Sequence, residues 1–210
     1  MSKHISHIYI VDDEASIRQS LLLMLSSLGC PIQTFDSGET FLANSDPKSA
    51  GCVVLDLRMP KLSGVQVFDA LLASQSPQVV IFLSGHGDIP TALTQSKRGA
   101  IGWLEKPVDG DVLKGEVRDA LVISDQRVAA MKLWETLTKR EKETSHLVAD
   151  GWANKETARL LVPPVDDRTV ATFRASLQAK LGIDNIAHLR SWMIKNAWLT
   201  GFLDSNRHGA

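Results

Sequence analysis

The stretch "CVVLDLRMPKLSG", residues 52–64, gives the clearest indication of how the first half of the chain folds. It starts with a short apolar run that ends in a carboxylate, Asp56, and it then passes into a segment containing Pro, Lys, Ser and Gly. An apolar run without polar alternation is typical of a strand buried on both faces of a parallel sheet. A carboxylate that ends such a strand lies at the edge where open α/β sheets place their binding sites.

Four similar runs surround this strand within the first 123 residues, and amphipathic helix-like segments separate them. One such segment, residues 15–29, ends in Gly29, which is a typical helix stop. The four runs are "HIYIV" (7–11), "PIQTF" (31–35), "QVVIFLS" (78–84) and "AIGWL" (100–104). Alternating strands and helices predict a parallel sheet with helices on both faces.

The composition fits two ordinary domains. The chain has 210 residues, of which 44% are hydrophobic, and a net charge of -1. Residues 1–123 carry 10 basic and 14 acidic side chains, whereas residues 124–210 carry 13 basic and 10 acidic ones, which weakly favours a cation-using domain followed by a nucleic-acid binder. Two cysteines without metal-ligand spacing, no signal-like start and no long apolar run indicate a soluble cytoplasmic protein with no membrane partner.

Three acidic residues are expected at one edge of the sheet. Asp12 and Asp13 follow the first strand, and Asp56 ends the third. Carboxylates this close stay ionised only beside positive charge, and Mg²⁺ prefers such oxygen ligands. Asp56 could then attack a phosphoryl group and form an aspartyl-phosphate. In the alternative interpretation, Asp12 and Asp13 cap the helix near Glu14, and Asp56 only ends a strand.

Two further strand ends carry groups suited to a phosphoryl ligand. Ser84 ends the fourth strand and Lys106 follows the fifth. A hydroxyl and an ammonium at these positions would bind phosphoryl oxygens by hydrogen bonds and charge. The alternatives are that Ser84 is a cap or turn residue and that Lys106 is a solvated lysine.

With these motifs together, residues 5–122 resemble the receiver domain of bacterial response regulators, in the branch close to FixJ. The resemblance rests on "VDD", "VVLDLRMPKLSG", "FLSGHGDIPTAL" and "AIGWLEKPV". It implies a flavodoxin-like (CheY-like) fold with a five-stranded parallel sheet in the order 2-1-3-4-5. It also implies a sensor histidine kinase as phosphoryl donor and Asp56 as phosphoacceptor, with Mg²⁺ held by Asp13, Asp56 and the Arg58 carbonyl, and with Asp12 assisting.

The same resemblance implies how phosphorylation would be transmitted. Lys106 would bind the phosphoryl group, Ser84 and Trp103 would form a switch pair, and the Lys106–Pro107 bond would be cis. Trp103 departs from the usual Tyr or Phe, and an ordinary partly buried aromatic residue is the alternative. Residues 88–122, spanning helix 4, strand 5 and helix 5, would pair two receivers into a homodimer.

That pairing surface contains basic residues on its expected edge. Lys97 and Arg98 could bridge to Asp111 or Glu116 of a partner chain. A solvated pair of charges without a role is the alternative.

From residue 137 onward the pattern is all-helical and resembles the LuxR-type helix-turn-helix domain, over about 137–199. Thr138 and Glu141 have the spacing of a capping box. Relative to the family pattern, two extra residues lie within "VPPVDD" (162–167). The prolines predict a longer turn outside both helices, and Asp166 or Asp167 would cap the next helix.

A helical projection of that next helix gives it an apolar and an exposed face. Val170, Phe173, Leu177 and Leu181 would pack inward. On the opposite face, Arg168 could reach guanine or phosphate, and Gln178 suits a phosphate. The remaining predicted contacts to DNA are Ala171, Thr172 and Ala175 at thymine methyl groups, with Arg174 and Lys180 at backbone phosphates.

The predicted organisation is a receiver at 1–123, a helical linker at 124–136, a helix-turn-helix domain at 137–200 and a tail at 201–210. The leading hypothesis is a two-component transcription regulator in which phosphorylated receivers pair and two helix-turn-helix units bind DNA. The alternative is a phosphorylation-dependent protein-interaction module that no longer reads DNA. A phosphatase would need a second acid at position 58, which is Arg58, so no turnover enzyme is expected.

Overall fold

The computed structural model describes residues 6–85 and 89–202, and it divides into two compact units. The first unit is Met1–Val128 and the second is Ala129–Ala210, so the division falls within one helix. The ends of the predicted receiver and tail, together with "HGD" of the third receiver motif, lie outside the described residues. Among the described residues, none of the helices has the length and apolar character needed to cross a membrane.

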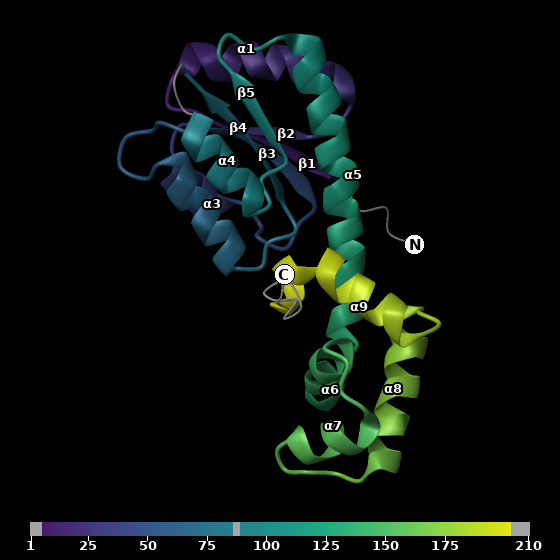
Figure 1. The fold of residues 1–210 in the computed structure, drawn as a ribbon. Helices are drawn as coiled ribbons and strands as arrows, with labels where there is room; N and C mark the ends of the chain where they lie inside the picture. Colours follow the sequence, from purple (N-terminus) through teal and green to yellow (C-terminus); the bar gives the residue numbers. More distant parts are fainter. Residues whose placement is uncertain (1–5, 86–88, 203–210) are drawn as a thin grey trace. The chain divides into compact units, whose positions relative to one another are not determined.

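The first unit is built on a five-stranded parallel sheet in the order β2-β1-β3-β4-β5, as predicted (Figure 1). The strands are β1 (His7–Val11), β2 (Ile32–Phe35), β3 (Gly51–Asp56), β4 (Val79–Ser84) and β5 (Gly102–Glu105). The fifth strand was predicted two residues too early. Ala100 still belongs to the end of the preceding helix, because its N–H donates to the Gln95 carbonyl at 3.1 Å.

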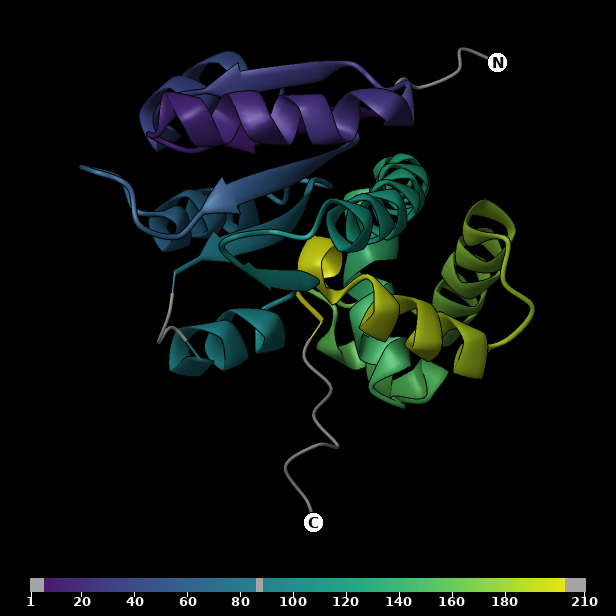
Figure 2. The same ribbon diagram turned by 90° about the horizontal axis from the view of Figure 1, so that it is seen from above.

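Helices cover both faces of this sheet, and α3 and α4 lie on the opposite side from α5 (Figures 1 and 2). The helices are α1 (Ala15–Leu25), a 3-10 turn η1 (Ser26–Leu28), α2 (Gly38–Asn44), α3 (Gly64–Ala73), α4 (Ile89–Lys97) and α5 (Gly110–Glu135). Strand alternation divides the core in two. Ile8 and Ile10 pack with α1 and α5, whereas Tyr9 and Val11 pack with α2 and α3. Both faces of β3 are therefore buried along its whole length, as its apolar run indicated.

The second unit is all-helical. It holds the C-terminal part of α5, followed by α6 (Lys139–Ala149), α7 (Asn154–Leu160), α8 (Asp167–Leu181), α9 (Ile186–Lys195) and the short α10 (Ala197–Thr200). Its core combines Leu177 of α8 and Met193 of α9 with Met131 and Trp134 of α5. The Trp134 ring stacks on Trp192, with 5.9 Å between the ring centroids.

The local signals at the starts of these helices are confirmed. Thr138 and Glu141 form the predicted capping box of α6. Asp166 caps α8, because its carboxylate accepts a hydrogen bond from the Thr169 N–H at 2.6 Å. Residues 161–166 lie between α7 and α8, so the inserted prolines lengthen the turn and leave both helices intact.

Candidate functional site

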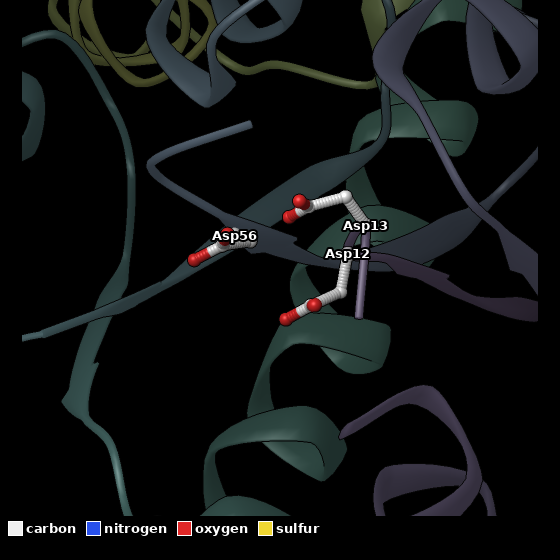
Figure 3. A group of neighbouring side chains, drawn as sticks. All are labelled: Asp12, Asp13 and Asp56. Atoms are coloured by element: carbon white, nitrogen blue, oxygen red, sulfur yellow. The ribbon is translucent and has the colours of Figure 1, made fainter. Parts of the chain in front are cut away.

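Three carboxylates meet at the carboxyl edge of the sheet. Asp12 and Asp13 follow β1, and Asp56 ends the neighbouring β3, whose Leu55 is in register with Val11. One oxygen of each carboxylate lies within 4.8 Å of the others, and Figure 3 shows the three side chains converging. Asp12 and Asp56 are buried, whereas Asp13 is exposed. The predicted convergence is thus confirmed, and the cluster opens to solvent through Asp13.

Lys106 supplies the positive charge beside this cluster. Its Nζ lies 2.7 Å from Asp12 Oδ2 and 3.0 Å from Asp56 Oδ1. Lys106 follows β5, and its backbone N–H donates to the Ser84 carbonyl at 2.8 Å, which holds it at the same edge. The bond from Lys106 to Pro107 is cis, as the resemblance implied. One ammonium beside three carboxylates leaves an excess of negative charge, and an all-oxygen set of this kind suits a hard divalent cation such as Mg²⁺.

The pKa shifts at this edge reflect the same balance. Burial raises the pKa of Asp56 above its ordinary value, and the hydrogen bond and charge of Lys106 offset only part of that rise. Burial alone would lower the pKa of Lys106, but hydrogen bonds and charges from Asp12 and Asp56 outweigh it, so the pKa is raised. The lysine therefore remains an ammonium, while a bound cation would favour the ionised form of Asp56 further.

The helix-capping interpretation of the first acidic pair applies in part. Asp12 Oδ1 accepts a hydrogen bond from the Glu14 N–H at 2.9 Å, while Oδ2 faces Lys106. The N-cap residue of α1 is Glu14 itself, and its side chain makes no capping hydrogen bond. Arg18 donates to the carbonyls of Asp12 and Asp13, at 2.7 and 3.0 Å. These bonds hold the β1–α1 turn in place and leave the Asp13 carboxylate directed towards Asp56 (Figure 3).

The loop after Asp56 is folded tightly against that residue. The Arg58 backbone makes a hydrogen bond that lowers the Asp56 pKa, and the Gly64 N–H donates to the Leu57 carbonyl at 3.0 Å. A Cβ on Gly64 would lie 2.3 Å from the Asp56 carbonyl oxygen, so only glycine fits there. Sequence analysis had quoted Gly64 in a motif without giving it a role. The close approach of α3 to the Asp56 backbone is the reason for it.

Ser84 and Trp103 lie on neighbouring strands and on one face of the sheet. Ser84 is 2% exposed at the end of β4, and Phe82 of the same strand is in register with Trp103 of β5. Residues two apart on a strand share a face, so Ser84, Phe82 and Trp103 lie on the same side. The Trp103 ring is partly buried, and its centroid is 5.2 Å from that of Phe82. The pair has the placement that a switch would need, while the switching itself stays a prediction.

On the surface predicted to pair receivers, two of the charged residues have partners in the same chain. Arg98 lies 2.6 Å from Asp69 of α3, donates to Gln95 and stands over the Phe68 ring. Asp111 pairs with Lys114 at 3.1 Å. Bridges between chains from Arg98 or to Asp111 would compete with these contacts.

The exposed face of α8 carries the residues predicted to touch DNA. Arg168, Ala171, Thr172 and Ala175 are exposed, whereas Arg174, Gln178 and Lys180 are partly buried. Val170, Leu177 and Leu181 are buried and Phe173 is partly buried, as the helical projection predicted. Ala179 is also exposed, although it was not among the predicted contacts.

The partly buried members of this set hold α8 to the rest of its unit. Arg174 donates to Asn154 Oδ1 at 2.6 Å, and Gln178 donates to the Asp184 carbonyl at 3.1 Å. Lys180 Nζ lies 2.7 and 2.9 Å from the two carboxylate oxygens of Glu141. These three residues have structural partners, so a contact with phosphate would be additional to those bonds or would replace them.

Glu141 is a buried anion that the sequence indicated only as a helix cap. Besides the Lys180 ammonium, its carboxylate accepts hydrogen bonds from the Ser176 hydroxyl and from the Thr138 N–H. Burial alone would raise its pKa, but these donors outweigh burial and lower the pKa to about 2. Glu141 thereby fixes α8 against α6.

Comparison with known proteins agrees with this geometry. Residues 8–118 match the response regulator receiver domain, and residues 135–193 match the bacterial regulatory proteins of the luxR family. The tetrathionate response regulatory protein TtrR of Salmonella typhimurium is 38% identical over 185 residues, which cover 87% of this chain and 89% of that protein. The transcriptional regulatory protein FixJ of Bradyrhizobium diazoefficiens is 33% identical over 192 residues, covering 87% and 92%.

Solved structures give the same result. The response regulator StyR has a TM-score of 0.56 at 32% identity, covering 90% of this chain and 98% of that one. Full-length FixJ from B. japonicum has a TM-score of 0.55 at 31% identity, covering 91% and 97%.

A receiver domain followed by a helix-turn-helix domain defines the class of two-component transcriptional regulators. Within this class, the chain belongs to the NarL/FixJ family of response regulators, with a LuxR-type DNA-binding domain. The receiver implies a histidine kinase as partner, and the LuxR-type domain implies DNA.

Proposed function

We propose that Asp56 is the phosphoacceptor of this regulator and that a phosphoryl group there controls DNA binding. The observation that supports this most directly is the Lys106 ammonium in contact with both Asp12 and Asp56. In the transfer, an Asp56 carboxylate oxygen forms a bond to phosphorus while the bond from phosphorus to the kinase histidine nitrogen breaks. Lys106 lies where it can move from a carboxylate oxygen to a phosphoryl oxygen and stabilise the added charge.

The residues that would hold magnesium are Asp13, Asp56 and the Arg58 carbonyl, with Asp12 assisting. Magnesium, when bound, supplies charge neutralisation for the carboxylates and the phosphoryl oxygens. Asp13 is the exposed member of the cluster, which suits a ligand that must admit the ion together with its waters. Asp12 is held by Lys106 and by the Glu14 N–H, so it would orient the site.

A phosphoryl group on Asp56 would draw in Ser84, and Trp103 would turn into the space beside it. Phosphorylation adds about -1.5 to -2 charges next to these residues. The α4–β5–α5 surface would then pair two receivers, and two helix-turn-helix units would bind a pseudo-palindromic site. The chain would accept one phosphoryl group per switch, so it acts in the cytoplasm as a regulator and catalyses no turnover of its own.

A salt titration of DNA binding tests this proposal. The full chain is incubated with fragments from its own promoter neighbourhood, with and without the phosphoryl mimic beryllofluoride plus Mg²⁺. We expect binding that weakens with salt and is strengthened by the mimic. Asp56→Ala should abolish the response. Asp46→Asn, which changes an exposed carboxylate before β3, should retain it.

Two outcomes would contradict the proposal. A response that survives Asp56→Ala would exclude Asp56 as the site at which the mimic acts. Dimers that form with the mimic but show no affinity for DNA above background would favour the alternative, a protein-interaction module.

A further inference from the structure

The inference concerns how α8 recognises bases, and it rests on the proposed function, in which this helix enters the major groove. The polar groups in its second half are engaged within the protein. Arg174 donates to Asn154, Gln178 to the Asp184 carbonyl, and Lys180 pairs with Glu141. These bonds direct the polar ends of the three side chains to protein partners and away from base edges.

The exposed residues of the first half are small and largely apolar. Ala171 and Ala175 are exposed and offer only methyl groups. Thr172 is exposed between them, and its hydroxyl donates to the Arg168 carbonyl at 3.2 Å, one turn back along the helix. With its hydroxyl used inside the helix, Thr172 also offers a methyl group. Arg168 is the exposed cation at the start of this stripe.

A base pair can be read through apolar contact at only one major-groove feature, the C5-methyl group of thymine. Arginine at the start of the stripe matches the O6 and N7 acceptors of guanine. From Arg168 to Ala175 the helix rises about 10 Å. That length spans about three base steps, because each step along a strand is about 3.4 Å.

We propose that α8 reads thymine methyl groups through Ala171, Thr172 and Ala175, with Arg168 contacting one guanine beside them. The preferred half-site is a guanine flanked by thymines within about three base pairs. Affinity for the correct site then depends on 5-methyl groups more than on polar base contacts.

Replacing thymine by deoxyuridine tests this directly, because the change removes only the 5-methyl group. The full chain, activated with beryllofluoride and Mg²⁺, first selects its site from a random duplex library. Each thymine of the selected half-sites is then replaced in turn, and the dissociation constant is measured. We expect a loss of about fourfold for each contacted methyl group, and no loss for thymines outside the half-sites.

A pairwise cycle locates the contact. Thr172→Ser keeps the hydroxyl and removes the methyl group, so one deoxyuridine substitution should cease to matter in this variant. Thr136→Ser is the matched control, because Thr136 is exposed, makes the same type of hydroxyl-to-carbonyl bond (2.7 Å to Leu133) and lies off α8. Arg168→Ala should relax the preference for guanine.

The outcomes separate this inference from the function on which it rests. Specific binding that is unaffected by deoxyuridine throughout the half-sites overturns methyl recognition and leaves the DNA-binding regulator intact. Selection that yields no preferred sequence, although the mimic is present, overturns sequence-specific binding and methyl recognition with it.

Discussion

The ionised carboxylate of Glu141 is expected to stabilise the helix-turn-helix unit strongly at neutral pH. Its pKa is lowered from 4.5 to about 2 by the Lys180 ammonium, the Ser176 hydroxyl and the Thr138 backbone, against the effect of burial. Each pKa unit corresponds to about 1.36 kcal/mol, so the shift corresponds to about 3 kcal/mol at pH 7. Glu141→Gln should lower the free energy of unfolding of this unit by that order.

The pH dependence has a definite sign. Because the pKa is lower in the folded than in the unfolded chain, the stabilisation is fully present above about pH 4.5 and is lost as the pH falls towards 2. At pH 3 only about 1.4 kcal/mol should remain. The cost of Glu141→Gln should shrink in step, since the substitution removes a charge that protonation would remove anyway.

Hydrogen exchange of the α6 and α8 amides in the full chain measures this, because it reports the opening free energy of the unit itself. Glu143→Gln is the matched control. Glu143 lies two residues away on α6, and its pair with Arg140 has side chains 36% and 30% exposed. An exposed pair of this kind contributes about 0–1 kcal/mol. The explanation fails if the two variants cost the same at pH 7, or if their difference stays constant down to pH 3.

Three further outcomes are expected. Asp69→Asn removes the carboxylate that lies 2.6 Å from Arg98, so it should free the arginine and strengthen mimic-induced dimers about twofold to fivefold in sedimentation experiments; unchanged dimerisation would mean that Arg98 takes no part in pairing. Gly64→Ala should destabilise the receiver by roughly 2–4 kcal/mol in urea unfolding, because its Cβ would lie 2.3 Å from the Asp56 carbonyl oxygen; near-wild-type stability would contradict that clash. Cys52 is fully buried and its thiol pKa is raised by burial, so a thiol reagent at pH 8 should label the partly exposed Cys30 first and reach Cys52 only on unfolding; equal labelling of the native chain would exclude that burial.

The acidic edge could be predicted from sequence because its geometry follows from topology. Asp12, Asp13 and Asp56 directly follow apolar strands, and the carboxyl ends of parallel strands meet at one edge whatever the side chains elsewhere. Lys106 was found for the same reason. The start of β5 was misplaced because Ala100 and Ile101 are apolar, and apolar character alone does not distinguish a helix end from a strand start.

The contacts that sequence analysis missed join residues far apart in the chain. Glu141 and Lys180 are 39 positions apart, so the local pattern revealed only the capping bond of Glu141 to Thr138. Arg98 was assigned to an interface between chains because nothing in the sequence indicates that α3 carries Asp69 to within 2.6 Å of it. Such pairs depend on how helices pack, and packing is not encoded in any short window.

The helix α5 has a consequence for chimeric regulators. Leu113 and Val117 belong to the core of the first unit, while Met131 and Trp134, on the same helix, belong to the core of the second. A fusion joined at residue 137, where the helix-turn-helix pattern begins, would separate the second unit from two of its buried side chains. Exchange of output domains between relatives should therefore be made within α5 near residue 128, so that each module inherits its own share of the helix.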